Sequence, residues 1–267
     1  MQLRAYILLP VAWGHLNQGD AKTTRNKTMK LPTRLRKWAM AVLLGAAVGL
    51  AGCATGPDAD PRDPIEPLNR AVHSFNNDLL DRALLEPLAQ GYNYITPDPV
   101  NRGVTNFFNN LRDVRSAINN LLQFKIGRAF SDVGRFAINS TIGILGLMDV
   151  ASNMNLPSYK EDFGQTLGVW GMGSGPFIVF PFLGPSSARD GVGLVADWFT
   201  DPLYYMNDDQ WRFRLRALNI VDTRADLSSA SRVVDEAALD PYAFIRDAYL
   251  QRRESLVYDG NPPEPDE

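Results

Sequence analysis

The chain has 267 residues, of which 45% are hydrophobic and 21% charged, and its formal net charge is −3. This composition, with a mean hydropathy of −0.19, excludes a polytopic membrane protein and a disordered chain. The residues after Cys53 include 19 basic and 29 acidic side chains, which is a net charge of −10. A body this acidic is a poor match for nucleic acid or anionic lipid headgroups. We therefore expect no nucleic-acid partner, and we expect any membrane contact to be apolar.

Cysteine and histidine are scarce. Cys53 is the sole cysteine, and His73 is the one histidine that follows it. A disulfide framework, a zinc–cysteine cluster and a multi-histidine metal site are therefore excluded from the body. A serine–histidine triad would depend on His73. We expect no metal and no cofactor.

Residues 29–52 have the anatomy of a secretory signal. A basic start at Met29 leads into an uncharged run of thirteen residues, from Trp38 to Leu50, and the small residues Ala51 and Gly52 follow. A helix of that length spans about 20 Å, less than the roughly 30 Å hydrocarbon core of a bilayer. The run is predicted to be a cleaved signal peptide and not a transmembrane anchor.

The end of this signal, Leu50-Ala51-Gly52-Cys53, resembles the bacterial lipobox, in which the cysteine thiol receives a diacylglycerol and the cysteine becomes the mature N-terminus. An ordinary signal peptide with a chance cysteine is the alternative, but a sole cysteine at the cleavage point favours lipidation of Cys53. Ala54 stands where an aspartate would retain an enterobacterial lipoprotein in the inner membrane, so we expect the outer membrane. Residues 1–28 precede a complete signal and are predicted to be an over-extended gene start.

Two segments rich in proline and acidic residues flank the predicted domain, residues 65–258. Residues 53–64 are predicted to be a flexible tether and residues 259–267 a disordered acidic tail. Asp58, Asp60 and Asp63 lack the glycine and terminal glutamate of a calcium loop, so we expect them to be solvated.

Between these segments the apolar residues repeat with a helical period. The stripes are Leu68, Val72, Phe75 and Leu79 on a helix that opens near Glu66; Val100, Val104, Phe107, Phe108 and Leu111; Val114, Ala117, Ile118, Leu121 and Leu122; and Ile126, Ala129, Phe130, Val133, Phe136 and Ala137. Further helices are predicted over Ser187–Phe199, where Ser187 and Asp190 form a capping box, over about Trp211–Val234, and over Pro241–Val257. No comparable series of strands is present, so the predicted fold class is all-α.

A glycine-rich stretch, residues 164–184, interrupts this helical pattern. Its apolar part is Phe177, Ile178, Val179, Phe180, Pro181, Phe182 and Leu183, and its flanking glycines include Gly171, Gly173, Gly175 and Gly184. Pro181 argues against a regular central strand or a helix. A buried loop or a short strand pair is one interpretation. The other is an apolar hairpin that enters lipid, with these four glycines as hinges.

Motifs for cofactor or hydrolase chemistry are incomplete. Gly171 to Pro176 has a proline in place of the third glycine of a dinucleotide fingerprint, and Ser174 lacks the glycine two residues earlier that a nucleophile elbow needs. His73 fits a helix surface or boundary better than catalysis. The acid pairs Glu161–Asp162 and Asp208–Asp209 are expected to be solvated. Six asparagines fit a polar channel and local caps equally well: Asn106, Asn109, Asn110, Asn119, Asn120 and Asn139.

Several motifs, taken in order, resemble the MlaA (VacJ) family of outer-membrane lipoproteins from Asp63 to Tyr258. They are residues 63–70 (DPIEPLNR), Phe75-Asn76, residues 139–143 (NSTIG), residues 161–168 (EDFGQTLG), Gly175-Pro176 with Pro181, residues 184–186 (GPS), Arg189-Asp190 and residues 240–242 (DPY).

The resemblance implies a ring-like helical body in the periplasmic leaflet of the outer membrane, with an amphipathic channel and a trimeric porin as partner. It implies removal of misplaced phospholipid from the outer leaflet and transfer to a periplasmic lipid carrier similar to MlaC, with no catalytic residue. It also implies that Cys53 is the lipid anchor, that residues 177–183 lie beside the channel, and that Phe75 and Asn76 lie near the pore. Given such a channel, our hypothesis is that the glycines around residues 177–183 let the hairpin shift and gate it.

Two other functions compete with this one. An envelope lipid hydrolase would use His73 as its base. A passive structural lipoprotein would only tether layers of the envelope and would carry no lipid in its body.

Overall fold

The structure is a computed structural model, and it describes residues 60–263, except for the side chains of residues 235–237. The predicted start, signal peptide and lipidated Cys53 lie outside the described residues. The elements are α2 Glu66–Ser74, the π-helix η1 Phe75–Leu85, α3 Glu86–Ile95, α4 Asp98–Leu122, α5 Ile126–Thr141, α6 Val150–Asn153, α7 Phe163–Val169, β1 Phe177–Phe180, β2 Gly184–Ser187, α8 Ala188–Thr200, the 3₁₀ helix η2 Pro202–Tyr205, α9 Asp209–Asp226, α10 Ser228–Ala237 and α11 Pro241–Val257. The prediction of an all-α fold with an apolar hairpin is confirmed.

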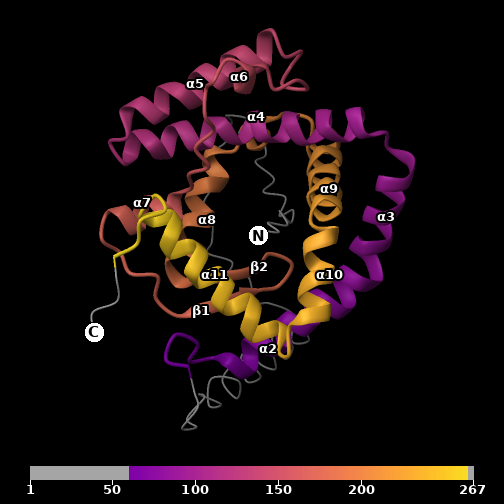
Figure 1. Ribbon diagram of the computed structural model, residues 1–267, viewed down its shortest axis with the longest axis vertical. Coiled ribbons are helices and arrows are strands. Elements are labelled where there is room, and N and C mark those ends of the chain that lie inside the picture. The colour runs from indigo at the N-terminus through magenta and orange to yellow at the C-terminus, as the bar shows by residue number, and fades with distance from the viewer. Residues whose placement is uncertain (1–59, 264–267) are drawn as a thin grey trace, which may run out of the picture.

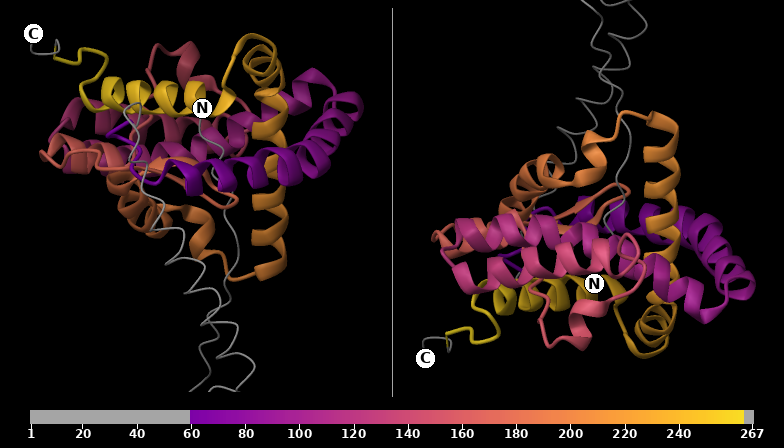
Figure 2. Two further views of the ribbon diagram at one scale, coloured as in Figure 1. Left: turned by 90° about the horizontal axis from the view of Figure 1, so that it is seen from below. Right: turned by 90° about the horizontal axis from the view of Figure 1, so that it is seen from above.

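The helices form a ring (Figure 1). Around it, α4 contacts α9, α9 contacts α10, α10 contacts α11, α11 contacts α7, and α7 contacts α4 again. Outside this circuit, α5 packs on α4 and α3 packs on α9. In side view the ring is flat, and the segment from α8 to α9 extends from one of its sides (Figure 2).

Short polar side chains begin several helices at positions that the sequence marks. Ser187 accepts a hydrogen bond from the backbone N–H of Asp190 at 3.2 Å, which confirms the N-cap predicted for α8. Asp162, Asp208 and Asp240 cap α7, α9 and α11 in the same way. The apolar stripes predicted on residues 100–111 and 114–122 lie on one continuous helix, α4.

A continuous helical segment, α2–η1–α3, curves along one edge of the ring (Figure 1). Its middle turns are π-helical and end just before Glu86 and Pro87. Proline lacks the N–H that would continue the hydrogen-bond ladder, so the local geometry must change there. Leu68, Phe75 and Leu79 of the predicted stripe are exposed, whereas Val72 packs against the hydrophobic core. Most of this stripe therefore faces outward.

The glycine-rich stretch is part helix and part hairpin. Its first residues belong to α7, which corrects the expectation that helical structure stops there. β1 and β2 pair antiparallel, with Phe177 opposite Ser187 and Phe180 opposite Gly184. Pro181 lies in the turn, where its missing N–H costs no ladder hydrogen bond.

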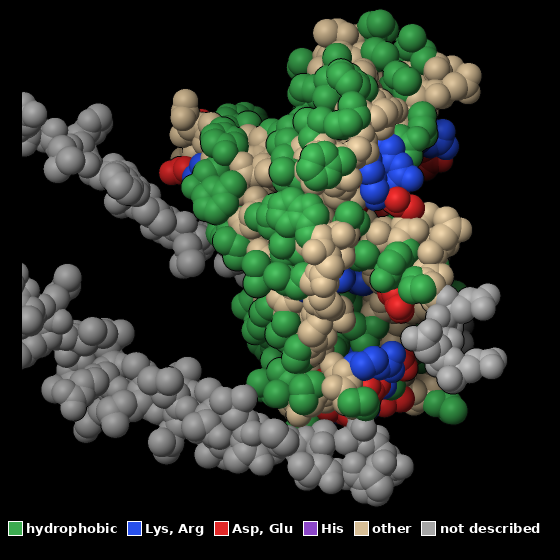
Figure 3. Space-filling model, turned by 90° about the vertical axis from the view of Figure 1, so that its left-hand side faces the viewer, with side chains coloured by type: hydrophobic (Ala, Val, Ile, Leu, Met, Phe, Trp, Pro, Cys, Tyr) green, Lys and Arg blue, Asp and Glu red, His purple; other side chains and the backbone are tan. Residues whose placement is uncertain are grey.

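Burial in this protein is inverted. Among the described residues, 25 buried side chains are polar or charged, whereas 13 are hydrophobic. Hydrophobic side chains cover much of the face where α5, α7 and α8 lie (Figure 3), and Phe130 of α5 is 72% exposed. A chain that folds in water buries apolar side chains in preference to polar ones. The outer surface is therefore suited to an apolar solvent, although none of the described helices is long and apolar enough to cross a bilayer.

Glycines allow α7 and α8 to pack closely. A Cβ on Gly193 of α8 would lie 2.5 Å from the backbone nitrogen of Gly164 and 2.8 Å from its Cα. We expect Gly193→Ala to lower the free energy of unfolding by about 1–3 kcal/mol, because backbone must move to admit the methyl group. A Cβ on Gly91 of α3 would meet open space, so Gly91→Ala should raise the free energy of unfolding by up to about 1 kcal/mol. Thermal unfolding of both variants checks this pair, and a loss at Gly91 equal to that at Gly193 would contradict it.

Both flanks of the predicted domain take part in the fold. Asp63, assigned to the solvated tether, is completely buried, and Asp60 forms ion pairs with Arg62 at 2.7 Å and Arg246 at 3.1 Å. Asp259, assigned to the disordered tail, forms an ion pair with Lys125 at 2.6 Å. The predicted boundaries were wrong here because composition reports local polarity and not the partners that distant residues provide.

Candidate functional site

A cavity of about 460 Å³ lies inside the ring. Its wall comes from α4, the loop before α7, α7 itself, η2, α9, α10 and α11, which together include every helix of the ring circuit. The wall contains apolar side chains, such as Phe108 and Leu203, as well as charged ones. The cavity is therefore amphipathic, and it is the candidate functional site.

The charge of the cavity wall is opposite to that of the body. Six wall residues are basic, namely Arg112, Arg115, Lys160, Arg216, Arg252 and Arg253, and four are acidic, namely Asp113, Glu161, Asp162 and Asp201. The difference is +2 (6 − 4), in a body whose net charge is −10. The cavity thus concentrates positive charge in an acidic protein.

Each of the four wall carboxylates already has a partner. Asp113 accepts from Arg135 at 3.2 Å, Glu161 from Gln123 at 3.0 Å and Asp162 from Arg253 at 2.7 Å, and Asp201 lies 3.7 Å from Arg216. In contrast, no carboxylate of the described residues pairs with the exposed side chains of Lys160 or Arg252. Positive charge is thus left available where the loop before α7 meets α11.

Asp113 gives the site a pH-dependent stability. Burial, opposed in part by Arg135, raises the pKa of Asp113 to about 6. A raised carboxyl pKa stabilises the fold at low pH, and this stabilisation is lost as the pH rises through 6. Between pH 7.5 and pH 4.5 the wild type should gain on the order of 2 kcal/mol that Asp113→Asn lacks. Denaturant unfolding of both proteins at both pH values measures this difference, and a pH-independent difference would refute it.

Arg253 of α11 lies in the cavity wall and joins three elements of the fold. Its side chain is 2% exposed and donates to Asp162 at 2.7 and 2.9 Å and to Asp190 of α8 at 2.7 and 2.8 Å. Tyr249 donates to Asp190 as well, at 2.6 Å. Burial alone would raise the pKa of Asp190, but the hydrogen bonds and charge of Arg253 hold it below its usual value. In the predicted capping box, the Asp190 carboxylate would bond back to the backbone at the start of α8. Here it accepts from Arg253 and Tyr249.

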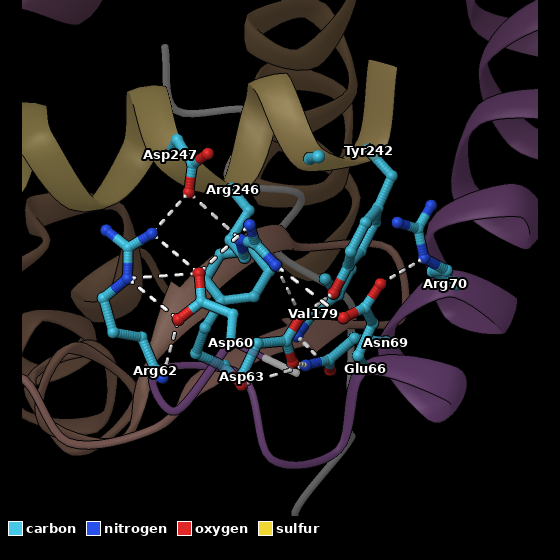
Figure 4. A network of polar contacts seen from close by, with 12 residues as sticks. Asp60, Arg62, Asp63, Glu66, Asn69, Arg70, Val179, Tyr242, Arg246 and Asp247 are labelled. Carbon is cyan, nitrogen blue, oxygen red and sulfur yellow. Dashed lines mark hydrogen bonds and ion pairs between the residues drawn. The ribbon is translucent and has the colours of Figure 1, made fainter. Parts of the chain in front are cut away.

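A second polar network joins α2, β1 and α11 (Figure 4). Asp63 accepts hydrogen bonds from the Tyr242 hydroxyl and from the Asn69 amide, the latter at 2.7 Å. Arg70 stacks 4.3 Å above the Tyr242 ring and pairs with Asp240 at 2.6 Å. The DPIEPLNR and DPY motifs, far apart in the chain, thus meet in one network.

The same network fixes the predicted hairpin. The Asn69 side chain donates to the carbonyl of Phe177 and accepts from the N–H of Val179, both at 2.9 Å. Further along the same helical segment, Asn76 of η1 donates to the Phe180 carbonyl and accepts from the N–H of Phe182. Two asparagine amides therefore take the place of a neighbouring strand along β1.

The structure divides the residues predicted to contact lipid or act as a gate. Phe177 and Val179 are buried with Tyr242 and Tyr249 in a hydrophobic core, so membrane contact was wrong for these two. Alternate residues of a strand point to opposite faces, and one face of β1 packs on this core. Pro181 and Phe182 at the turn are exposed, whereas Ile178, Phe180 and Leu183 are partly exposed. Their lipid contact stays a prediction, as does gating.

The remaining predicted site residues lie near the hairpin but outside the cavity wall. Phe75 packs edge-to-face on Phe182 with ring centroids 5.5 Å apart, and neither Phe75 nor Asn76 belongs to the wall. Three of the four hinge glycines have positive φ, namely Gly171, Gly175 and Gly184, whereas Gly173 does not. A hinge motion of this segment would have to break the four hydrogen bonds from Asn69 and Asn76.

His73 lies away from the cavity wall. Its ring meets the edge of Tyr242 at 5.5 Å, and burial lowers the pKa of the imidazole. The boundary position predicted for this histidine is therefore confirmed, because the side chain is half-buried.

The polar residues left open by the sequence serve mainly to join elements. Four of the six asparagines are buried, and among them Asn110 bonds to Ser140, Asn120 to Asp132 and Asn139 to Asp149, while Asn119 accepts from Thr166. Asn109 alone among the six lies in the cavity wall. Glu161 and Asp162 are buried, which corrects the expectation that this acid pair is solvated, whereas Asp208 and Asp209 are exposed as expected.

Sequence reasoning missed the basic residues of the cavity. Lys160, Arg252 and Arg253 lie on a loop and a helix that are remote in the chain, and no local motif links them. The sequence gives no signal for this cluster, because the six basic residues of the wall come from separate segments of the chain and only the fold brings them together.

A ring of helices with charged groups inside and apolar side chains outside defines a class of protein in which the usual polarity of inside and outside is reversed. A profile of the MlaA lipoprotein family matches residues 61–256. The chain belongs to the MlaA lipoprotein family.

Individual relatives agree with this assignment. The chain is 33% identical over 229 residues to the intermembrane phospholipid transport system lipoprotein MlaA of Escherichia coli, covering 82% of this chain and 88% of the relative. It is 32% identical over 223 residues to the MlaA lipoprotein of Haemophilus influenzae, covering 80% and 88%. A solved structure described as the structural basis for maintenance of bacterial outer membrane lipid asymmetry superposes with a TM-score of 0.65 at 32% identity, covering 73% of this chain and 98% of that one.

Proposed function

We propose that this protein is an outer-membrane lipoprotein that carries phospholipid headgroups through its cavity and so maintains the lipid asymmetry of that membrane. The observation that carries the proposal is the inverted polarity: the ring has apolar side chains outside and a charged cavity inside. Crossing hydrocarbon is costly for a charged headgroup unless polar groups receive it. A cavity that receives the headgroup while the acyl chains stay outside lowers that cost.

The finer parts of the proposal concern attachment and partners. Cys53 carries the acyl chains that hold the ring at the periplasmic leaflet, and the tip of the hairpin, Pro181 and Phe182, lies among acyl chains. Phospholipid misplaced in the outer leaflet enters the cavity and is passed to a periplasmic lipid carrier of the MlaC kind. A trimeric porin holds the ring at the membrane. The names of the E. coli and H. influenzae relatives refer to intermembrane phospholipid transport, which supports phospholipid as the cargo.

Surface phospholipid in cells tests the proposal. Deleting the gene should raise the outer-leaflet phospholipid, and the wild-type gene should restore it. Ala230→Trp places a large side chain in the cavity wall and should fail to restore it. Ser229→Trp changes the adjacent exposed residue of α10, which lies outside the wall, and should restore it.

Two results would refute the function. An unchanged surface-phospholipid content after deletion would support a purely structural lipoprotein. Cleavage of phospholipid by the pure protein, lost in His73→Ala, would support a hydrolase.

A further inference from the structure

We propose that the cavity selects phospholipids whose headgroup carries net negative charge, and that Lys160 and Arg252 bind that charge at the cavity wall. This inference rests on the proposed function and adds the class of lipid that the site prefers. The chemistry recognised is a phosphate without an ammonium group beside it, as in phosphatidylglycerol.

The placement of the two cations follows from the Arg253 network. Lys160 lies two residues before Asp162, and Arg252 lies one residue before Arg253. Since Arg253 bonds to Asp162 at 2.7 Å, the loop bearing Lys160 and the helix bearing Arg252 are held side by side. Both side chains line the cavity, and both are exposed. Two flexible cations on a fixed support can approach one phosphate together.

The same wall offers little to an ammonium group. A zwitterionic headgroup, such as phosphatidylethanolamine, needs a carboxylate near its amine. Asp113, Glu161, Asp162 and Asp201 are the wall carboxylates, and each is already engaged by the protein's own cations or donors. A zwitterionic headgroup is net neutral, so it leaves the excess positive charge of the wall unchanged, and the wall repels its ammonium group. A net negative headgroup lowers that excess.

Competition between two lipids in one vesicle tests the inference. The purified full-length lipoprotein is incubated with vesicles that contain equal amounts of phosphatidylglycerol and phosphatidylethanolamine with identical acyl chains, and the lipid retained after repurification is measured by mass spectrometry. We expect the wild type to retain about tenfold more phosphatidylglycerol, because a charge-assisted hydrogen bond accounts for roughly that factor. The double variant Lys160→Gln/Arg252→Gln should retain both lipids about equally.

Controls separate the site from general electrostatics. Arg102→Gln removes an exposed cation of α4 that lies outside the cavity wall and should keep the tenfold preference. Inorganic phosphate added in excess should not displace the lipid, and displacement would mean that the site binds a bare phosphate ion and not a headgroup. Thermal unfolding of each variant shows that the ring is intact.

The outcomes distinguish this inference from the function on which it rests. If the wild type retains lipid in the proportion of the vesicle, the inference falls and the transport function stands. A preference that the double variant keeps would also overturn it. If no lipid of either kind is retained, the transport function itself falls, and the inference falls with it.

Discussion

Replacing Arg253 with methionine should cause a loss of stability of about 3–5 kcal/mol, because two buried carboxylates, Asp162 and Asp190, lose the guanidinium that compensates their charge. For a domain of this size that loss corresponds to a fall in melting temperature of roughly 10 °C. Thermal and denaturant unfolding of the purified protein measure both quantities.

Arg252→Met provides the matched control. It makes the same chemical change one residue away, at an exposed side chain, and should alter stability by no more than about 0.5 kcal/mol. Adding Asp162→Asn and Asp190→Asn to Arg253→Met should recover part of the loss, because the uncompensated charges are then removed. Equal losses at positions 252 and 253 would show that the buried network does not stabilise the ring.

Replacing Asn69 with leucine should cost about 3–5 kcal/mol as well. The change keeps the approximate size of the side chain but leaves the N–H of Val179, the carbonyl of Phe177 and one oxygen of Asp63 without a buried partner. Unfolding measurements give the loss, and hydrogen exchange at the Val179 amide should become much faster.

Asn76→Leu is the corresponding control at the tip of the hairpin. Asn76 makes the same pair of bonds to backbone, but Phe182, its donor, is exposed, so water can replace the amide. We expect a loss of about 1 kcal/mol and faster exchange at Phe182 with little change at Val179. A larger effect at position 76 than at 69 would mean that the hairpin is held from its tip and not along β1.

The parts of the fold that sequence could predict are those set by local pattern. The apolar period and the caps predicted α4, α5, α8 and α11, and Pro241–Val257 matches the helix to the residue. α7 was missed because two of its seven residues, Gly164 and Gly168, are poor helix formers. Those glycines are needed there because a Cβ at Gly164 would lie 2.7 Å from Arg253 and one at Gly168 2.6 Å from Val257.

The site was less accessible to sequence reasoning. The resemblance carried the ring and the lipid function. Lipid contact was wrong for Phe177 and Val179, because β1 turns them into the core, and it stays a prediction for the rest of the hairpin. The cavity wall depends on pairs such as Asp162 and Arg253, which are 91 residues apart. No periodicity links residues at that separation, and burial of an acid pair depends on which cation arrives from elsewhere in the chain.

The helix α11 carries the last partners for both polar networks. Tyr242, near its start, reaches Asp63 across 179 residues of chain, and Arg253, near its end, reaches α7 and α8. Synthesis proceeds from the N-terminus, so α11 is the last of these elements to be made. Until those residues emerge, Asp63, Asp162 and Asp190 have no partner from α11 and the ring stays open. We therefore expect a nascent chain halted upstream of residue 241 to be bound by chaperones or degraded by proteases.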